Sequence, residues 1–401
     1  MKEGWKILPL ADLCEFQRGL TYSKGDEVEF SSNVVLRANN VDLLTNQLDL
    51  SELKYISDQI QIPSSKVLRV KSLLICTASG SKSHLGKVAF VDKEYGYAFG
   101  GFMGQITPLP SILPRFLFHA LTSEAYKKFI SALSDGANIN NLKFDDLARF
   151  LVPVPPLPEQ QRIVALLDEA FAGLATAKAN AERNLQSARA VYESHVESIF
   201  STRGEDWEEK RLEEVCGFQN GFAFKSSTFK PQGYPILRIS NIQDGRIDAA
   251  NRIVFFDPND YREDLDRYRV SKGDLLIAMS GATTGKLGFN IEEKVYYLNQ
   301  RVGKFEPTKR LDPRFLYYFL STRVEENLRI SAGSAQPNLS TEQIKGFLLP
   351  LPSIDEQTRI VDVLEALSKE TQHLTQIYER KLAALEELKQ SLLQQAFNGE
   401  L

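Results

Sequence analysis

The chain has 401 residues, of which 43% are hydrophobic and 25% are charged, and its formal net charge is −4. This composition is typical of an ordinary soluble protein of two to four domains. No stretch approaches the roughly 18 consecutive apolar residues of a membrane helix, and the N-terminus lacks the apolar core of a signal peptide, so we expect a cytoplasmic protein. Cys14, Cys76 and Cys216 are odd in number and irregularly spaced, which argues against a disulfide framework and a zinc site.

The second half of the sequence repeats the first. Single residues recur 202 positions apart, among them Trp5 and Trp207, Cys14 and Cys216, and Gly19 and Gly221. Motifs recur as well, namely LRANNV at 36–41 and LRISNI at 237–242, PRFL at 114–117 and 313–316, and PVPPLPEQQRIV at 153–164 and PLPSIDEQTRIV at 350–361. This period far exceeds the roughly 20–50 residues of a solenoid repeat, so each copy is predicted to fold around its own core.

Residues 1–152 form the first predicted globular domain, and residues 204–350 form the second. Short apolar runs such as VVLRA, SLLICTA and GKVAFV alternate with Gly, Asn, Ser and Asp, which predicts strands and turns. PRFLFHALTSEAYKKFISAL and PRFLYYFLSTRVEENLRI predict embedded helices. The predicted fold class is α+β, with a twisted and partly barrel-like sheet in each domain.

Each globular domain is followed by a proline junction, within residues 153–203 and 351–401. Proline disfavours helical conformation in the residue before it, so VPPLP predicts a stiff, extended lead-in to a helix. Ser353 and Glu356 fit a capping box at the second helix start. Pro156 replaces the serine in the first copy, where Glu159 lies near the positive end of the helix dipole.

Beyond each junction, apolar residues recur at steps of three and four, which predicts two long helices. We expect them to run from Glu159 to Phe200 and from Glu356 to Phe397. Because such helices are polar over most of their circumference, each needs a partner, and an antiparallel coiled-coil pair is the favoured arrangement. The alternative is that each helix packs on its own domain.

The cations are concentrated in the two globular domains. Residues 1–152 contain 17 Lys and Arg against 16 Asp and Glu, and residues 204–350 contain 21 against 21. A one-sided basic face is compatible with this balance, although neutrality on average does not require one.

No catalytic or nucleotide-binding motif is complete. GATTGKLG at 281–288 has three residues between its first glycine and Gly-Lys, where a phosphate-binding loop has four, and Leu287 follows the lysine. The four histidines, His84, His119, His195 and His373, are scattered, and no nucleophile–histidine pairing is indicated. The sequence therefore predicts a protein that binds and positions without chemistry of its own, and it requires no cofactor.

The doubled motifs resemble one known family closely, the specificity (S) subunits of type I restriction-modification enzymes. The resemblance is carried by both PLP…EQ…RIV motifs, by GDLLIAMSGATTGKLG, by NQR at 299–301, by SAQPNLS at 334–340 and by the terminal FNGEL. It covers the whole chain in the expected order.

The resemblance implies that each globular domain is a target recognition domain for one half of a bipartite DNA sequence. The helices would form an internal pseudo-twofold pair that acts as a spacer. Two modification subunits would bind around the spacer and methylate adenines, and restriction subunits would join to cleave the DNA. Differences between the copies, such as Gly100 and Gly101 opposite Asn299 and Gln300, would encode different half-sites or reflect drift in structural loops.

Candidate DNA contacts lie in polar or glycine-rich loops, because phosphates are bound by Lys, Ser, Thr and backbone amides and bases by Arg, Lys, Asn and Gln. They are Ser81, Lys82, Thr283, Thr284 and Lys286 for phosphate or groove contact, Asn138, Asn140, Gln336 and Asn338 for base contact, and Arg37 and Arg238 for DNA or a structural ion pair. For each of them a structural role remains open: glycine-rich turns can close a sheet, and loop amides can hydrogen-bond the backbone.

Two other functions remain open. A coiled-coil scaffold could bind proteins through its globular domains, and salt would distinguish it, since DNA binding weakens steeply with added salt. An enzyme with its own methyltransferase or nuclease site is disfavoured by the missing motifs.

Overall fold

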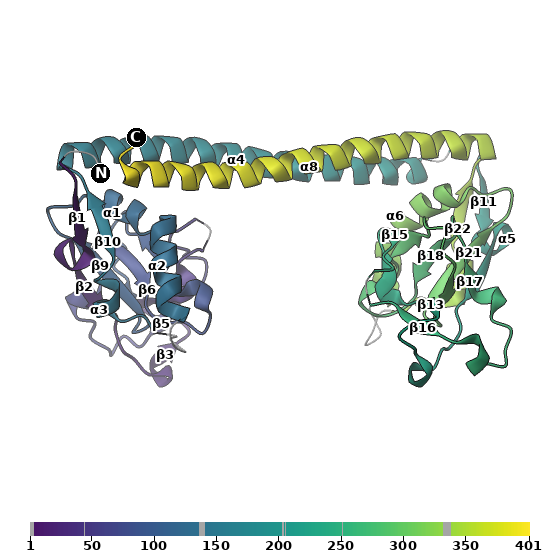
Figure 1. Ribbon diagram of the computed structural model, residues 1–401, viewed down its shortest axis with the longest axis horizontal. Helices are drawn as coiled ribbons and strands as arrows, with labels where there is room; N and C mark the ends of the chain where they lie inside the picture. The colour runs from purple at the N-terminus through teal and green to yellow at the C-terminus, as the bar shows by residue number, and fades with distance from the viewer. Residues whose placement is uncertain are drawn as a thin grey trace. The chain divides into compact units, whose positions relative to one another are not determined.

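The computed structural model describes residues 4–43, 45–135, 141–202, 204, 206–250, 252–331 and 338–401 (Figure 1). The chain divides into unit 1, made of Met1–Arg183 and Glu379–Leu401, and unit 2, made of Asn184–Tyr378. Both boundaries fall within the long helices α4 (Leu157–Ser201) and α8 (Ile354–Asn398). Each unit therefore contains part of both helices.

Unit 1 contains two four-stranded sheets. The first has the order β2-β9-β6-β7 and is antiparallel, and the second has the order β3-β5-β4-β8 with β4 parallel to β8. The bounds are β2 Cys14–Arg18, β3 Glu27–Val28, β4 Asn33–Leu36, β5 Lys54–Ile56, β6 Leu73–Cys76, β7 Val88–Phe90, β8 Ala98–Phe99 and β9 Met103–Pro108. All four residues of β6 are buried, as expected for a central strand with an unbroken apolar run.

Unit 2 repeats this topology. Its six-stranded sheet, β12-β21-β18-β19-β15-β14, contains the same four-strand order, and in its second sheet, β16-β13-β20-β17, strands β13 and β20 are parallel. The bounds are β12 Cys216–Asn220, β13 Tyr234–Leu237, β14 Ile242–Gln243, β15 Gly245–Ile247, β16 Val254–Phe256, β17 Arg269–Val270, β18 Leu275–Ala278, β19 Leu287–Phe289, β20 Tyr296–Leu298 and β21 Val302–Pro307. The predicted α+β class and the internal repeat are confirmed.

A close backbone approach explains one repeated glycine. A Cβ atom at Gly19 would lie 1.9 Å from the carbonyl oxygen of Gly100, and one at Gly221 would lie 2.0 Å from the carbonyl oxygen of Asn299. No side chain fits at these distances. The chain leaving β2 or β12 therefore crosses the turn that begins at Gly100 or Asn299, with backbone against backbone.

Helices cover the first sheet of each unit. In unit 1 they are α1 (Pro114–Ala120), α2 (Glu124–Asp135) and α3 (Phe144–Leu147), and in unit 2 they are α5 (Leu212–Val215), α6 (Pro313–Ser331) and α7 (Thr341–Lys345). The segment that continues as α6 in unit 2 is divided in unit 1, where the Ser123 hydroxyl accepts a hydrogen bond from the Tyr126 amide and begins a new helix.

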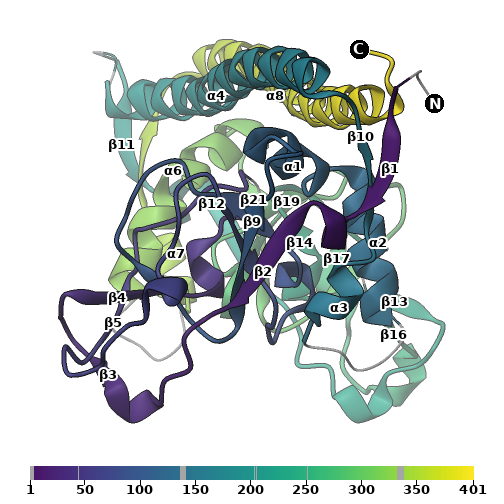
Figure 2. The ribbon, with the colours of Figure 1, turned by 90° about the vertical axis from the view of Figure 1, so that its left-hand side faces the viewer.

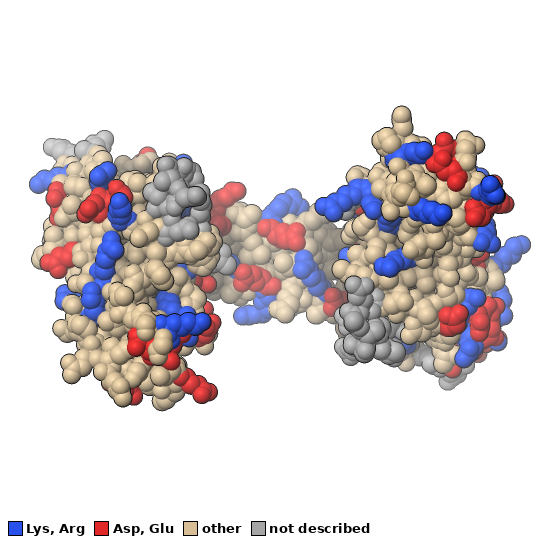
Figure 3. All heavy atoms as spheres, turned by 90° about the horizontal axis from the view of Figure 1, so that it is seen from below, with Lys and Arg blue, Asp and Glu red and all other residues tan. Residues whose placement is uncertain are grey.

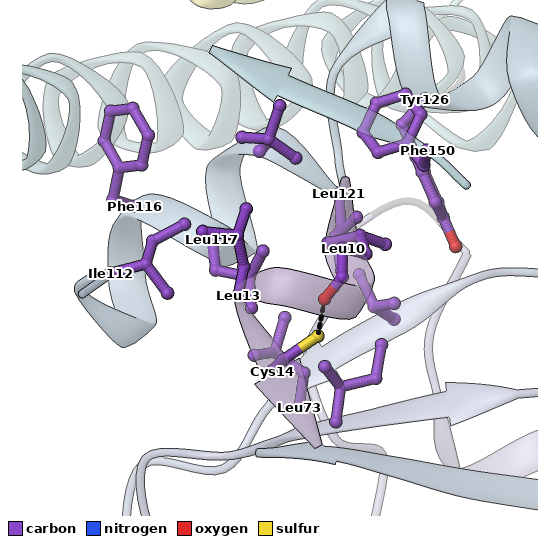
Figure 4. Close-up of a cluster of buried hydrophobic side chains, with 14 of the residues drawn as sticks. Leu10, Leu13, Cys14, Leu73, Ile112, Phe116, Leu117, Leu121, Tyr126 and Phe150 are labelled. Atoms are coloured by element: carbon purple, nitrogen blue, oxygen red, sulfur yellow. Dashed lines mark hydrogen bonds between the residues drawn. The ribbon is translucent and has the colours of Figure 1, made fainter. Parts of the chain in front are cut away.

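The core of unit 1 lies between these helices and the sheet (Figure 4). Leu10, Leu13, Phe116 and Leu117 are fully buried there. The Cys14 thiol donates a hydrogen bond to the Leu10 carbonyl oxygen at 3.1 Å. All three cysteines are buried free thiols.

A two-stranded ribbon precedes each long helix. In unit 1 β1 (Lys6–Pro9) pairs with β10 (Leu151–Val154), close to the start of α4 (Figure 2), and in unit 2 β11 (Glu208–Arg211) pairs with β22 (Leu348–Leu351). Both helices begin two residues before the predicted glutamates, at Leu157 and Ile354. In α4 this is possible because Pro158 lies in the first turn, where its missing N–H would have no helical partner.

The glutamine of each PLP…EQ motif is completely buried at the junction. Gln160 Oε1 accepts a hydrogen bond from the Leu113 amide at 2.8 Å, and its Nε2 donates to the carbonyl oxygens of Ser111 and Pro155. Gln357 makes the same pattern with the Asp312 amide and with the carbonyl oxygens of Arg310 and Pro352. These bonds connect the helix start to the loop that precedes α1 or α6.

At the second junction the Ser353 hydroxyl accepts a hydrogen bond from the Glu356 amide, which is one half of the predicted capping box.

The two long helices pack antiparallel within each unit. In unit 1 Ile163 near the start of α4 shares the core with Leu393 near the end of α8, and Arg162 Nη2 donates to the carbonyl oxygen of Leu401 at 2.5 Å. In unit 2 Phe200 at the end of α4 shares the core with Val361 near the start of α8. The predicted helix pair is confirmed, and each helix also packs on a globular domain, so both arrangements considered from the sequence occur together.

Aromatic and ionic contacts hold each globular domain on the helices in the same way. Phe116 meets Phe397 with ring centroids 5.2 Å apart, and Phe315 meets Phe200 at 5.3 Å. One residue before each of these domain phenylalanines, an arginine pairs with a helix carboxylate: Arg115 with Asp168 at 2.6 Å and Arg314 with Glu365 at 3.3 Å. The duplicated sequence therefore produces duplicated attachment.

Candidate nucleic-acid interface

Four segments meet in unit 1 at the ends of its strands. The segment after β6 contacts the turn Gly100–Met103, since the Thr77 and Ala78 amides donate to the Phe102 carbonyl oxygen at 2.9 and 3.0 Å. Ala78 also bridges to Asn141, and the Gly100 amide donates to the carbonyl oxygen of Leu36, next to Arg37. We call Arg37, 77–84, 100–103 and Asn141 loop cluster 1.

Unit 2 brings together the corresponding segments. The Met279 amide donates to the Arg301 carbonyl oxygen at 2.9 Å, Ser280 bridges to Asn338, and the Asn299 amide donates to Leu237 at 3.0 Å. We call Arg238, 279–286, 299–302 and Asn338 loop cluster 2. The candidate residues lie far apart in the sequence, and the fold brings those that the structure describes into these two clusters.

Ser81 is exposed in loop cluster 1, with its hydroxyl 2.8 Å from that of Ser83. Lys82 begins the short 3-10 turn Lys82–His84 beside it. Ser81 therefore lies on an exposed polar loop, as a phosphate or groove contact requires.

The threonines of loop cluster 2 are internally engaged. Thr284 is 5% exposed and donates to the carbonyl oxygen of Gly281, while the Thr283 hydroxyl donates to Ile239 at 3.2 Å. These bonds hold the glycine-rich turn against the segment after Arg238, which is the sheet-closing role considered from the sequence. The Lys286 ammonium lies 3.4 Å from the exposed carboxylate of Asp244.

The counterpart of Lys286 in unit 1 is Lys87, which is buried. Its ammonium is 2.5 Å from the Val41 carbonyl oxygen and 2.6 Å from His84 Nδ1, and burial lowers the pKa of Lys87. The two lysines therefore differ in environment although the strand positions correspond.

Three of the predicted base contacts, Asn138, Asn140 and Gln336, lie outside the described residues. Asn338 is described, and it is exposed beside Ser280.

Arg37 and Arg238 each lie one residue beyond a strand, β4 or β13, and precede a short turn closed by a buried asparagine. Arg37 Nη2 is 3.4 Å from the exposed carboxylate of Glu52, and Arg238 Nη2 donates to the carbonyl oxygen of Arg252. In both copies Nε is buried without a partner among the described residues. The guanidinium groups are therefore only partly satisfied within the protein.

Lys and Arg side chains are visible on the face of each unit shown in Figure 3, interspersed with Asp and Glu. On the left-hand unit they follow a line across the face, and on the right-hand unit they gather toward its upper edge. Local basic areas thus exist despite the neutral average of each domain.

Sequence reasoning missed the residue at the centre of each cluster, Phe102 in unit 1 and Arg301 in unit 2. The repeat itself held the signal, since the segment around Gly100 and Gly101 aligns with Asn299 and Gln300. Neither residue was predicted as a DNA contact, because the position of the turn depends on backbone hydrogen bonds that the sequence does not show.

Among the described residues, no group of three or more His, Cys, Asp and Glu side chains is arranged to bind a metal ion. The described helices also include none with the length and apolar character needed to span a bilayer.

The chain thus contains two copies of one α+β module. Each copy has a polar loop cluster at the ends of its strands, and each packs on a segment of an antiparallel helix pair. This arrangement is that of a recognition protein built from a duplicated domain. The model of the Type I restriction modification DNA specificity domain matches residues 2–183 and again residues 204–385. The chain belongs to this family of type I restriction-modification specificity subunits.

Similar proteins cover the chain from end to end. The EcoKI specificity subunit of Escherichia coli K12 is 29% identical over 100% of this chain and 90% of its own length. The StySPI specificity subunit of Salmonella potsdam is 26% identical with the same coverage.

Two solved structures share the fold. A chain from a structure described as the basis of complex assembly and conformational transition of the type I R-M system superposes with a TM-score of 0.81 at 20% identity, covering 100% of this chain and 99% of that one. The HsdS subunit of Thermoanaerobacter tengcongensis gives a TM-score of 0.63 at 20% identity, covering 100% and 98%.

Proposed function

We propose that this chain is the DNA-reading subunit of a type I restriction-modification complex, in which each globular domain reads one half of a bipartite target. Residues 1–152 and 204–350 are the two recognition domains, and residues 153–203 and 351–401 are the junctions and helices that space them. The chain determines the DNA sequence specificity of the complex and performs no catalysis. Its partners methylate adenines and, where restriction subunits join, cleave the DNA in the cytoplasm.

The observation that carries this proposal is the pair of loop clusters. Both have the same backbone connections, yet their exposed side chains differ. Two modules that share a backbone arrangement but differ in their exposed loop side chains can bind one duplex at two different sequences.

The docking of two modification subunits is supported by exposed apolar side chains that recur in both copies. They lie just before or after the start of the proline junctions or in the helices beyond them, and are between 41% and 57% exposed. They form pairs separated by 197 residues: Leu151 and Leu348, Leu157 and Ile354, and Leu166 and Val363. A duplicated apolar surface fits two copies of one partner.

Salt dependence tests DNA reading against the scaffold alternative. The chain assembled with its modification subunits is titrated with a target-containing duplex at increasing salt. We expect log K to fall linearly with log salt, with a slope of about 0.9 per phosphate contacted. Affinity that is independent of salt, or equal for duplexes with and without the target, would support the scaffold function.

A further inference from the structure

The same β-turn lies at the centre of both loop clusters. In unit 1 the Met103 amide donates to the Gly100 carbonyl oxygen at 2.8 Å, and in unit 2 the Val302 amide donates to the Asn299 carbonyl oxygen at 2.8 Å. The third residue of the turn is Phe102 in unit 1 and Arg301 in unit 2. Its carbonyl oxygen accepts an amide from the segment after β6 or β18. The backbone position is therefore fixed identically in the two units.

Both side chains at this position are exposed. Phe102 is 73% exposed, and it belongs to none of the buried clusters. Arg301 is exposed, and its guanidinium has no hydrogen bond or ion pair with any residue that the structure describes. A mostly exposed phenylalanine adds little to folding, so among the described residues nothing assigns either side chain a structural role.

The surroundings fit a duplex rather than an apolar protein partner. Phe102 contacts Ala78, which bridges to the exposed Asn141, and Arg301 contacts Met279, whose neighbour Ser280 bridges to the exposed Asn338. Phe102 projects from a turn that begins with Gly100 and Gly101, and Arg301 projects from a turn that begins with the polar Asn299 and Gln300. Such a turn permits close approach to DNA, and a single aromatic or basic side chain can then reach the base edges.

We infer that Phe102 and Arg301 are equivalent specificity-determining residues, each reading a base in its own half-site. This inference rests on the proposed function. The Arg301 guanidinium donates two hydrogen bonds to O6 and N7 of a guanine in the major groove, whereas the Phe102 ring contacts a thymine methyl group. One turn position, changed between the copies, thereby gives the two domains different preferences.

Methyl transfer by the complex of this chain with its modification subunits provides the test. The substrates are duplexes that carry the target with each of the four bases at every half-site position. For Arg301→Ala we expect the preference for guanine at one position of the unit 2 half-site to fall by roughly tenfold or more, with the other half-site unchanged. For Phe102→Ala we expect the loss of thymine preference at one position of the unit 1 half-site.

A variant that gains a new base preference distinguishes a change of specificity from a simple loss of activity. Phe102→Arg should replace thymine preference by guanine preference at that one position of the unit 1 half-site. Arg310→Ala is the matched control, since this exposed arginine of unit 2 pairs with Glu208 away from the loop cluster, and it should keep the wild-type pattern.

The outcomes separate the inference from the proposed function. If the wild-type complex methylates a split target and Arg301→Ala, Phe102→Ala and Phe102→Arg all keep its base preferences, the inference is overturned and the proposed function stands. If loss of modification-subunit binding accompanies each of these variants, the turn is a protein contact and the inference is also overturned. A wild-type complex that methylates no target would contradict the proposed function itself.

Discussion

Gln160 and Gln357 occupy the same place in the two repeats, and each makes three hydrogen bonds to backbone groups of its junction. The repeated glutamine is thus a buried connection between the loop before α1 or α6 and the first turn of α4 or α8. Its amide must both donate and accept, which explains why the residue type recurs.

Replacing the amide by a carboxylate should destabilise unit 1. In Gln160→Glu the carboxylate can still accept the Leu113 amide, but it cannot donate to the carbonyl oxygens of Ser111 and Pro155. Leaving buried polar groups unpaired costs about 1–3 kcal/mol each, so for two groups we expect the free energy of unfolding to fall by about 2–6 kcal/mol. Urea denaturation measures this, with Gln161→Glu at the adjacent exposed position as control. An equal decrease in the free energy of unfolding in both variants would contradict this role of Gln160.

Gly19 should tolerate no side chain. In Gly19→Ala the new methyl group would overlap the carbonyl oxygen of Gly100 and displace the turn that carries Phe102. We expect methylation to lose base preference in the unit 1 half-site only, and Gly221→Ala should affect the unit 2 half-site only. Gly173→Ala in α4 is the control, because a Cβ there would meet no atom within 4 Å apart from its neighbours in the same stretch of helix. Unchanged half-site reading in both loop variants, measured on duplex substrates, would rule out this coupling.

The repeated apolar surface predicts stoichiometry. Leu166 is 42% exposed and Val363 is 53% exposed, so an aspartate at either position should leave the fold intact but disrupt partner binding. We expect native mass spectrometry to find two modification subunits on the wild-type chain, one on Leu166→Asp and none on the double variant. Leu374→Asp changes an exposed leucine whose counterpart is Ala177, and it should retain two. Two subunits on the double variant would place the docking surface elsewhere.

The buried imidazole of His119 should make unit 1 less stable in mild acid. Burial lowers the pKa of His119 below its ordinary value of about 6.5, against the opposing hydrogen bond to Asp168 at 3.0 Å and with Arg115 and Lys389 adding to the decrease. As the pH falls through about 6.5 the unfolded chain takes up a proton that the folded unit does not, so the free energy of unfolding decreases. His119→Gln should show a smaller decrease from about pH 7 to about pH 5.

Urea titrations of wild type and His119→Gln at both pH values check this prediction. The same decrease in the free energy of unfolding between the two pH values in both proteins would contradict it. Burial raises the pKa of Asp168, but hydrogen bonds from His119 and Arg115 outweigh burial and bring that pKa to about 2. The stabilisation from Asp168 is therefore present above its ordinary pKa of about 4 and is lost only as the pH falls toward 2.

The repeat allowed much of this fold to be predicted from the sequence, because each copy tested the interpretation of the other. The helix pair followed from apolar spacing, and the junctions followed from proline chemistry. The helix starts were placed late, since Pro158 was taken to precede the helix although proline is tolerated in a first turn. The role of Gln160 was not predicted, because it depends on carbonyl groups that its junction and a distant loop present together.

The candidate site was predicted less completely for the same reason. Ser81 and Asn338 are polar and exposed, as a loop composition can indicate. Thr284 has the same composition signal, yet its hydroxyl is used within the turn. The repeat aligns Phe102 with Arg301, but their place at the centre of each loop cluster depends on backbone hydrogen bonds, which the sequence does not show.

The most direct test of DNA reading is a genome-wide map of adenine methylation in cells that carry the modification subunit with and without this chain. We predict a split motif, two specific half-sites separated by a fixed gap, that is methylated only when the chain is present. The absence of any chain-dependent motif, with the modification subunit active and bound to the chain, would contradict the proposed function.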